Sequence, residues 1–178
     1  SVSCWGNNNY GQLGDGTTTN RNTPTQTSSL GTDRTAVAID SGNQHTCAIL
    51  DDASMSCWGN NNYGQLGDGT TTDRSTPTQT SSLGTDRTAV AIATGYLHTC
   101  AILDDGSVSC WGQNNNGQLG DGTNTLRNTP TQTSSLGTDR TAALDSTYLP
   151  GGGGTSQTAC GAGTYQASTG QSACTDAS

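Results

Sequence analysis

The sequence contains no lysine, no glutamate and no phenylalanine, and leucine, isoleucine and valine together make up only 20 of its 178 residues. So low an apolar content normally favours disorder, because little surface can be buried. Six arginines stand against fourteen aspartates, which leaves a formal net charge of −8. Nucleic-acid binding needs clustered cations, so this balance argues against nucleic acid as a partner. No apolar run approaches the length of a membrane span, so we expect no membrane-spanning segment.

Common enzyme motifs are also missing. The chain has no GxSxG, HExxH, P-loop or dinucleotide-binding glycine motif, so we expect no catalytic residues and no cofactor. Asp15, Asp68 and Asp121 lie in GDGT segments, where Asp-Gly is typical of a turn. A calcium loop is the alternative, with Asp73 as a further acid in one copy, but its ligand spacing fits no known loop and we expect no metal.

What the chain does have is a long internal repeat. Residues 4–56 and 57–109 are identical at 45 of 53 positions, and a third copy follows the pattern from Cys110 to about residue 142. Stacked repeats bury a shared core, so order is favoured over disorder. We predict repeats over 1–145 (units 4–56, 57–109 and 110–145), a glycine-rich linker at 146–157 and a cysteine-rich segment at 158–178.

Each unit is expected to form about four short strands. Residues 23–29 read as an edge strand, because Pro24 cannot donate to a ladder. Residues 35–40 read as a strand with Val37 and Ile39 on one face, and HTCAIL then pairs with the returning SMSCW. The pattern predicts an all-β fold of tandem four-stranded propeller-type blades, with about 2.7 repeats and an incomplete ring.

The cysteines support a hairpin in each unit. With a three-residue loop at 104–106 and Gly106 in a left-handed conformation, Cys100 lies opposite Cys110, close enough for a disulfide at a non-hydrogen-bonded site. Cys47 and Cys57 have the same spacing, with Ala53 in place of the glycine, so that turn is expected to be strained or differently shaped. Free thiols or a zinc site are the alternatives, although no closely spaced cysteine pair exists. Disulfides indicate an oxidising compartment.

Cys4 has no counterpart ten residues upstream in this sequence. We expect it to be unpaired or to pair in an intermolecular bond, or the chain to be cut from a longer protein. Cys160 and Cys174, near the other end, are expected to bridge each other.

Recurring residues resemble the repeat of the regulator of chromosome condensation family. The resemblance covers about residues 1–142 and rests on Trp5-Gly6, Asn8, the segment 11–14 (GQLG), Gly16, Pro24, Gly42 and His45-Thr46, with their later copies. It implies β-propeller blades, which in this family close into a ring of about seven. The cysteine pair resembles secreted and surface members. The exchange-factor activity of the nuclear member is not implied, since no matching loop residues exist. Residues 158–178 resemble a small cysteine-rich receptor-ectodomain repeat.

Several side chains are expected to serve structure. We expect His45 and His98 to bond backbone within their own blades, and Trp5, Trp58 and Trp111 to pack in the core. The neighbouring pairs Asp33-Arg34, Asp86-Arg87 and Asp139-Arg140 are expected to anchor loops. Serine and threonine tracts are candidates for O-linked sugars, and no Asn-x-Ser/Thr sequon exists.

Together these features favour a non-enzymatic, extracellular or cell-surface structural protein. Nearly identical units predict head-to-tail self-association into a filament or surface appendage. The alternative is a fragment of a secreted, closed β-propeller that binds a protein or glycan through its loops.

Overall fold

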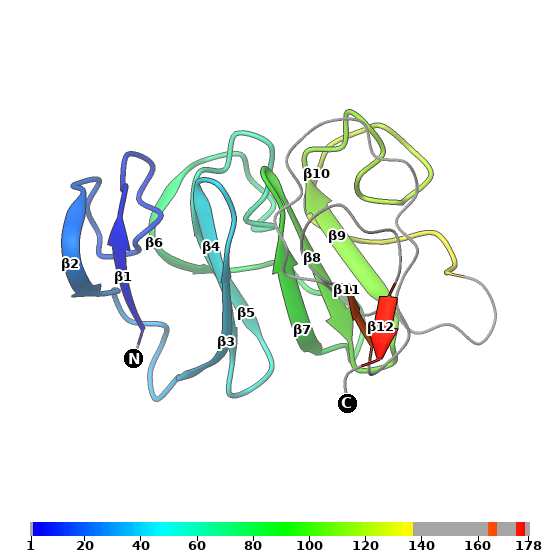
Figure 1. Cartoon of the computed structure of the whole chain (residues 1–178), viewed down its shortest axis with the longest axis horizontal. Coiled ribbons are helices and arrows are strands. Elements are labelled where there is room, and N and C mark those ends of the chain that lie inside the picture. The colour runs from blue at the N-terminus through cyan, green and yellow to red at the C-terminus, as the bar shows by residue number, and fades with distance from the viewer. Residues whose placement is uncertain (1, 137–163, 167–173, 177–178) are drawn as a thin grey trace.

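The chain folds into antiparallel sheets arranged side by side (Figure 1). The structure is a computed structural model, and it describes residues 2–136 and two short strands at 164–166 and 174–176. The first sheet pairs β1 (Ser3–Gly6) with β2 (Arg21–Gln26). The second sheet has the order β3 (Ala36–Ser41), β4 (His45–Leu50), β5 (Met55–Gly59), β6 (Arg74–Gln79).

The third sheet repeats the second one. It consists of β7 (Ala89–Thr94), β8 (His98–Leu103), β9 (Val108–Gly112) and β10 (Arg127–Gln132), paired in that order. A separate small sheet pairs β11 (Thr164–Gln166) with β12 (Cys174–Asp176). The prediction of an all-β fold with four-stranded propeller-type blades is confirmed. The unit boundary at Cys57 falls inside β5, so the second sheet draws on two consecutive sequence units.

Edge and central strands differ in composition as the sequence predicts. Strands β2, β6 and β10 lie at sheet edges and each carries a proline, which lacks the N–H that a central strand needs. In β4 and β5, at the centre of the second sheet, every residue is buried. Val37 and Ile39 lie on one face of β3 as predicted, and this face points outward, whereas Ala36 and Ala38 on the other face are less exposed.

The core lies between sheets. Ile49 and Met55 of the second sheet form one apolar cluster with Ala101, Leu103 and Trp111 of the third. An equivalent cluster joins Ala48, Leu50 and Trp58 to the first sheet through Cys4. Most of the stabilising burial therefore joins consecutive blades, which explains how a chain with few apolar residues can fold. The predicted linker at 146–157 and most of the segment 158–178 lie outside the described residues.

Candidate functional site: the blade interface and its open end

A tryptophan and a glycine loop form the centre of each blade interface. A Cβ added at Gly14 would lie 2.7 Å from the indole nitrogen of Trp58, and one at Gly67 would lie 2.7 Å from that of Trp111. Both glycines have positive φ, +70° and +69°. Glycine is thus required twice over, for its backbone conformation and for the ring that covers it. The first two GQLG loops, at 11–14 and 64–67, are each a socket for the tryptophan of the following sheet.

Hydrogen bonds reinforce this socket. The Thr46 hydroxyl donates to the Gln12 carbonyl and the Thr99 hydroxyl donates to the Gln65 carbonyl, both at 2.9 Å. The indole nitrogen of Trp111 also donates to Gln65, at 3.0 Å. Because these carbonyls would otherwise be buried without partners, the bonds fix how one sheet sits on the next.

His45 belongs to the same interface. Its Nε2 lies 2.9 Å from the hydroxyl of Thr99, a residue of the following sheet. The expected backbone partner within its own blade was therefore wrong: the bond runs between blades. Burial, together with the nearby His98, lowers the pKa of His45 to about 3, so the imidazole is neutral at physiological pH. A buried, neutral histidine at a packing interface has a structural role.

A polar clamp holds each loop that precedes an outer strand. The buried Asn8 side chain donates to Asp15 and to the carbonyls of Thr17 and Thr19, while its oxygen accepts from the Leu13 N–H. Asn61 and Asn114 repeat these bonds in the other two loops.

Asp15 completes the clamp through Arg21. The carboxylate is only 5% exposed and lies 2.7 Å from the Arg21 guanidinium. Burial raises its pKa, but hydrogen bonds from Thr17 and Arg21 outweigh burial and lower the pKa to about 2. Both carboxylate oxygens are engaged by the protein. The loop is thus organised by the turn chemistry expected of Asp15, with arginine as the counter-charge; in the described residues no group of three or more His, Cys, Asp or Glu could hold a metal.

The structure contains disulfides between Cys47 and Cys57 and between Cys100 and Cys110. Each pair is directly opposite across the central hairpin, with Cα atoms 4.1 Å apart, the close spacing of a non-hydrogen-bonded pair. Cys4 is a half-buried free thiol, and burial raises its pKa. The predicted bridge from Cys160 to Cys174 lies outside the described residues.

The first sheet is an open end of this system (Figure 1). In the described part of the chain it has two strands, and none of the described strands takes beside β1 the place that β4 takes beside β5. Trp5 is 62% exposed, whereas Trp58 and Trp111 are fully buried. The expectation that all three tryptophans pack in the core was therefore wrong for Trp5, because within the described residues no preceding loop covers it.

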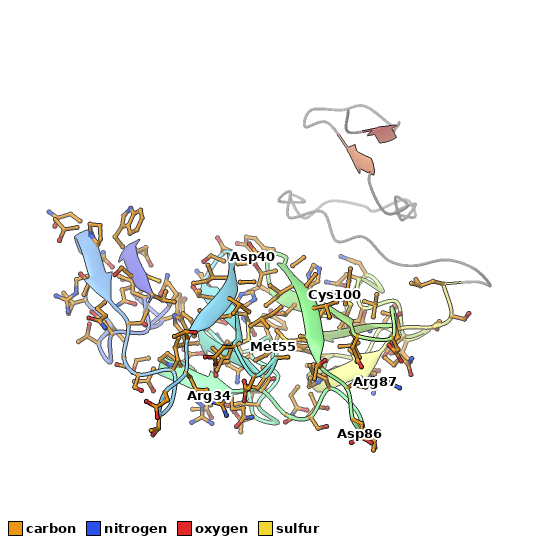
Figure 2. All side chains as sticks on the ribbon, turned by 90° about the horizontal axis from the view of Figure 1, so that it is seen from below. Arg34, Asp40, Met55, Asp86, Arg87 and Cys100 are labelled. Carbon is orange, nitrogen blue, oxygen red and sulfur yellow. A yellow bond between two sulfur atoms is a disulfide. The ribbon has the colours of Figure 1, made fainter. Side chains whose placement is uncertain are left out.

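Arginines anchor the far end of the blades, but not to their neighbours in sequence. Arg34 lies 2.8 Å from Asp52, and Arg87 lies 3.0 Å from Asp105 (both arginines labelled in Figure 2). The expected pairs Asp33-Arg34 and Asp86-Arg87 are replaced by contacts with the hairpin turns, and Asp139-Arg140 lies outside the described residues. Asp33 and Asp86 adopt positive φ and are exposed.

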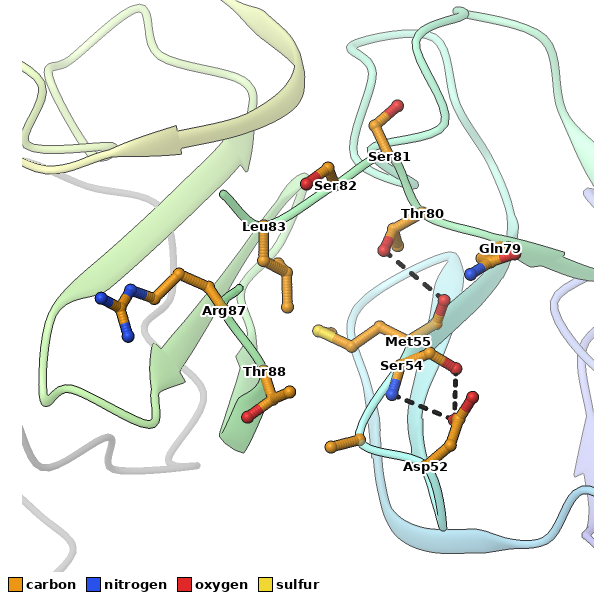
Figure 3. A pocket seen from close by; sticks show the side chains of 11 residues that line it. Asp52, Ser54, Met55, Gln79, Thr80, Ser81, Ser82, Leu83, Arg87 and Thr88 are labelled. Carbon is orange, nitrogen blue, oxygen red and sulfur yellow. Dashed lines mark hydrogen bonds between the residues drawn. The ribbon is translucent and has the colours of Figure 1, made fainter. Parts of the chain in front are cut away.

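A polar groove of about 330 Å³ opens beside the turn at 51–54 (Figure 3). Ser54, Met55 and Thr80 line one part, and Leu83 faces them from the connection that leads to the third sheet. Arg87 also lines the groove, but its guanidinium points away from them and pairs with Asp104 and Asp105. A second groove of about 590 Å³ lies on the other side of the turn and shares Asp52, Ser54 and Gln79. Both are open, and the Ser54 hydroxyl that they share donates to the Asp52 carboxylate at 2.6 Å within the turn.

The polar clamp and the hydrogen bonds from Thr46 and Thr99 to the GQLG sockets were not predicted from the sequence. Their signal was present, since Asn8, Asp15 and Arg21 recur at the repeat period together. Recurrence alone does not say which residues touch, and the partners Thr46 and Thr99 are common residues in this chain. The described part of the chain includes no helix long and apolar enough to cross a bilayer.

Comparison with known proteins agrees with this architecture. A family model described as the Regulator of chromosome condensation (RCC1) repeat matches residues 1–49, 56–102 and 105–144. The E3 ubiquitin-protein ligase HERC2 of Homo sapiens is 37% identical over 123 residues, 69% of this chain and 2% of HERC2. The ultraviolet-B receptor UVR8 of Arabidopsis thaliana is 33% identical over 135 residues, 76% of this chain and 30% of the receptor.

Solved structures show the same fold. Yeast RCC1 (Prp20), in a structure bound to Kap60, superposes with a TM-score of 0.65 at 21% identity, covering 76% of this chain and 34% of that one. Human WBSCR16 gives a TM-score of 0.62 at 22% identity, covering 75% and 35%. The chain thus spans about a third of each of these structures, and the family model matches most of its length. The chain belongs to the RCC1 repeat family.

Proposed function

We propose that this chain is a non-catalytic binding scaffold that contributes consecutive blades to a larger RCC1-type propeller. The observation that carries the proposal is the open first sheet, where Trp5 is 62% exposed although its two counterparts are fully buried. Trp5 is the same residue type as the two tryptophans at the blade interfaces, but none of the described GQLG loops forms a socket around it. A further unit of the same kind, placed before it, would supply that socket.

Protein partners are the class of ligand that the relatives favour. Yeast RCC1 is seen bound to Kap60, and the Saccharomyces cerevisiae Prp20p structure is described with binding properties to Gsp1p and histones. In this chain the two grooves beside the turn at 51–54 offer a surface with both polar and apolar groups, among them Leu83 and Arg87. We assign partner binding to this end of the blades.

An extracellular or cell-surface location is part of the proposal. Two cross-strand disulfides support it, since such bonds persist in oxidising compartments and are rare in the cytosol. By the chain-entropy estimate each bridge stabilises its blade by about 3 kcal/mol, a large contribution for a thin core.

Adding one unit tests the scaffold. A copy of residues 4–56 is inserted before Cys4, with phenylalanine at its own copy of Trp5. We expect the original Trp5 to lose its accessibility to acrylamide and its emission to shift to the blue. A matched insert with Gly14→Ala in the copy blocks the socket and should leave Trp5 quenchable. Equal quenching with both inserts would overturn the scaffold proposal.

Partner binding is tested from the groove. A photo-crosslinker at Ser82, in the groove, is compared with one at Thr23, on an exposed edge strand, in extracellular fractions of the source. A partner that is captured only from Ser82 should then, once purified, bind Leu83→Asp about tenfold more weakly and Thr23→Asp unchanged. Equal affinity for both variants contradicts binding at this end.

Head-to-tail assembly of separate copies is the second candidate. The same exposed Trp5 favours it, because the loop at 117–120 of another copy repeats the GQLG socket. In sedimentation velocity the wild-type chain should form a growing series of oligomers as concentration rises, and Trp5→Asp should remain monomeric. A wild-type chain that stays monomeric at every concentration excludes this candidate.

A further inference from the structure

One edge of β1 is free in the described structure and has the pairing pattern of a strand that binds another strand. Its pairing with β2 is the same as in the complete sheets: Ser3 faces Gln26, Cys4 faces Thr25 and Gly6 faces Arg21. In the second sheet the other edge of the equivalent strand, β5, is occupied by β4, and in the third sheet β8 occupies that edge of β9. Among the described residues, no strand lies beside β1 on that edge.

Gly6 shows where the additional strand would lie. A Cβ added at Gly59 would meet the Gln44 carbonyl oxygen at 2.5 Å and the His45 Cα at 2.8 Å, because β4 begins there. At Gly112 the start of β8 leaves equally little room. At Gly6 the same Cβ would meet nothing within 4 Å among the described residues. Beside Gly6 there is therefore room for the backbone of another strand, and no described residue occupies it.

Cys4 and Trp5 precede Gly6 on the free edge of β1. Their counterparts in the second sheet are bound by β4 in one register, with Cys57 opposite Cys47 and Trp58 opposite Thr46. The third sheet repeats this register. A strand bound in the same register would therefore cover both Cys4 and Trp5.

We propose that the free edge of β1 captures an unpaired strand of the HTCAIL type, antiparallel, with its cysteine opposite Cys4 and joined to it by a disulfide. The register places the strand's histidine opposite Gly6, its threonine opposite Trp5 and its alanine opposite Ser3. The inference rests on the proposed function, in which a further unit precedes β1.

A second folded copy is not the occupant. Both HTCAIL strands of this chain, β4 and β8, are already paired on both edges, so a copy would have to open a sheet to donate one. The occupant is a strand of this sequence that is not yet part of a sheet, and main-chain hydrogen bonds along the edge hold it as in other cases of strand addition.

The covalent step is a thiol–disulfide exchange. The thiolate of Cys4 attacks the strand's cysteine, which enters as a mixed disulfide with glutathione. The bond between Cys4 and the strand forms, the bond between strand and glutathione breaks, and the glutathione thiolate leaves and takes up a proton. Because burial raises the pKa of Cys4, the exchange is run in mildly alkaline buffer.

A synthetic peptide with the sequence of residues 42–52, carried as its glutathione mixed disulfide, tests the capture on the full chain. We expect intact mass to rise by one peptide, peptide mapping to place it on Cys4, and Cys4→Ser to abolish it. The control peptide has its threonine and cysteine exchanged, which turns the thiol to the other face of the strand. It should label Cys4 about tenfold more slowly.

Three results would overturn the inference: equal rates for the two peptides, attachment elsewhere than Cys4, or a Cys4-linked dimer of the chain in place of the adduct. The inserted unit described above separates the two proposals. If that unit shields Trp5 while the free peptide fails to exchange, strand capture is wrong and the scaffold stands. If the unit also leaves Trp5 exposed, both are wrong.

Discussion

At the scale of single residues, the two central hairpins differ at one turn position. Ala53 has φ +61° and Gly106 has φ +78°, and both N–H groups donate to the carbonyl three residues earlier. The turn therefore keeps its shape when alanine replaces glycine. The left-handed region is unfavourable for alanine by about 1 kcal/mol, so the second sheet carries strain that the third lacks.

Exchanging these two residues gives a reciprocal prediction. Ala53→Gly should raise the free energy of unfolding by about 1 kcal/mol, because the strain is relieved. Gly106→Ala should lower it by a similar amount. Urea titration of each variant measures both. Changes of the same sign in the two variants would show that φ at this position does not govern the stability of the turn.

His45 makes stability depend on pH. The unfolded chain takes up a proton below about pH 6.5, whereas the folded chain resists it until about pH 3. The free energy of unfolding should therefore decrease as pH falls from 6.5 toward 3. His45→Gln keeps a polar group near Thr99 but does not titrate, so its loss of stability over this range should be smaller.

The measurement is a urea titration repeated at pH values above the range in which aspartates titrate. The wild-type chain is the reference, and His98, whose pKa burial also lowers, accounts for a residual slope in the variant. Identical slopes for the two chains would show that His45 is protonated in the folded state, contrary to its buried position.

At the scale of elements, the polar clamp decides whether each long loop is ordered. Asn8→Ala removes the amide whose two N–H hydrogens are shared among Asp15 and the carbonyls of Thr17 and Thr19, and it leaves the Leu13 N–H buried without its acceptor. We expect the free energy of unfolding to fall by about 3 kcal/mol. Asn9→Ala, the exposed neighbour of the same type, should change it by less than about 0.5 kcal/mol. Thermal and urea unfolding compare the two, and equal costs would contradict the clamp.

Strands and turns were the elements best predicted from sequence. Proline in the outer strands, the glycine after two aspartates and the ten-residue cysteine spacing each act through local geometry, so edge position, turn shape and register followed. The charged loop contacts did not follow. Arg34 reaches Asp52 across the end of a blade, where side chains come together only after the sheet has formed.

At the scale of the whole molecule, the glycine sockets determine how blades stack. Gly67→Ala places a methyl group 2.7 Å from the indole nitrogen of Trp111, whereas Gly120→Ala meets its nearest described neighbour, Thr133, at 3.7 Å. Both positions have a similar positive φ, +69° and +65°, so the backbone cost is shared. The difference in stability between the two variants therefore measures the contact between the glycine loop and Trp111.

We expect Gly67→Ala to be less stable than Gly120→Ala by about 2 kcal/mol, the usual cost of overpacking a filled core. The near-ultraviolet circular dichroism of Trp111 should also change only in Gly67→Ala. Equal destabilisation with an unchanged tryptophan signal would mean that the loop moves aside freely and does not set the stacking of the blades.

The sequence by itself determined the repeat and the strands, because both follow from recurring local patterns, and it determined the turn at Gly106 and the pairing of Cys100 with Cys110, because both depend on residues within one hairpin. Only the tertiary structure decided the partner of His45, 54 residues away, the outward orientation of Val37 and Ile39, and the contrast between exposed Trp5 and buried Trp58. These depend on how one sheet packs against the next. Equivalent tryptophans acquire different environments because, among the described residues, a preceding sheet packs against Trp58 and none packs against Trp5, and no local pattern records that difference.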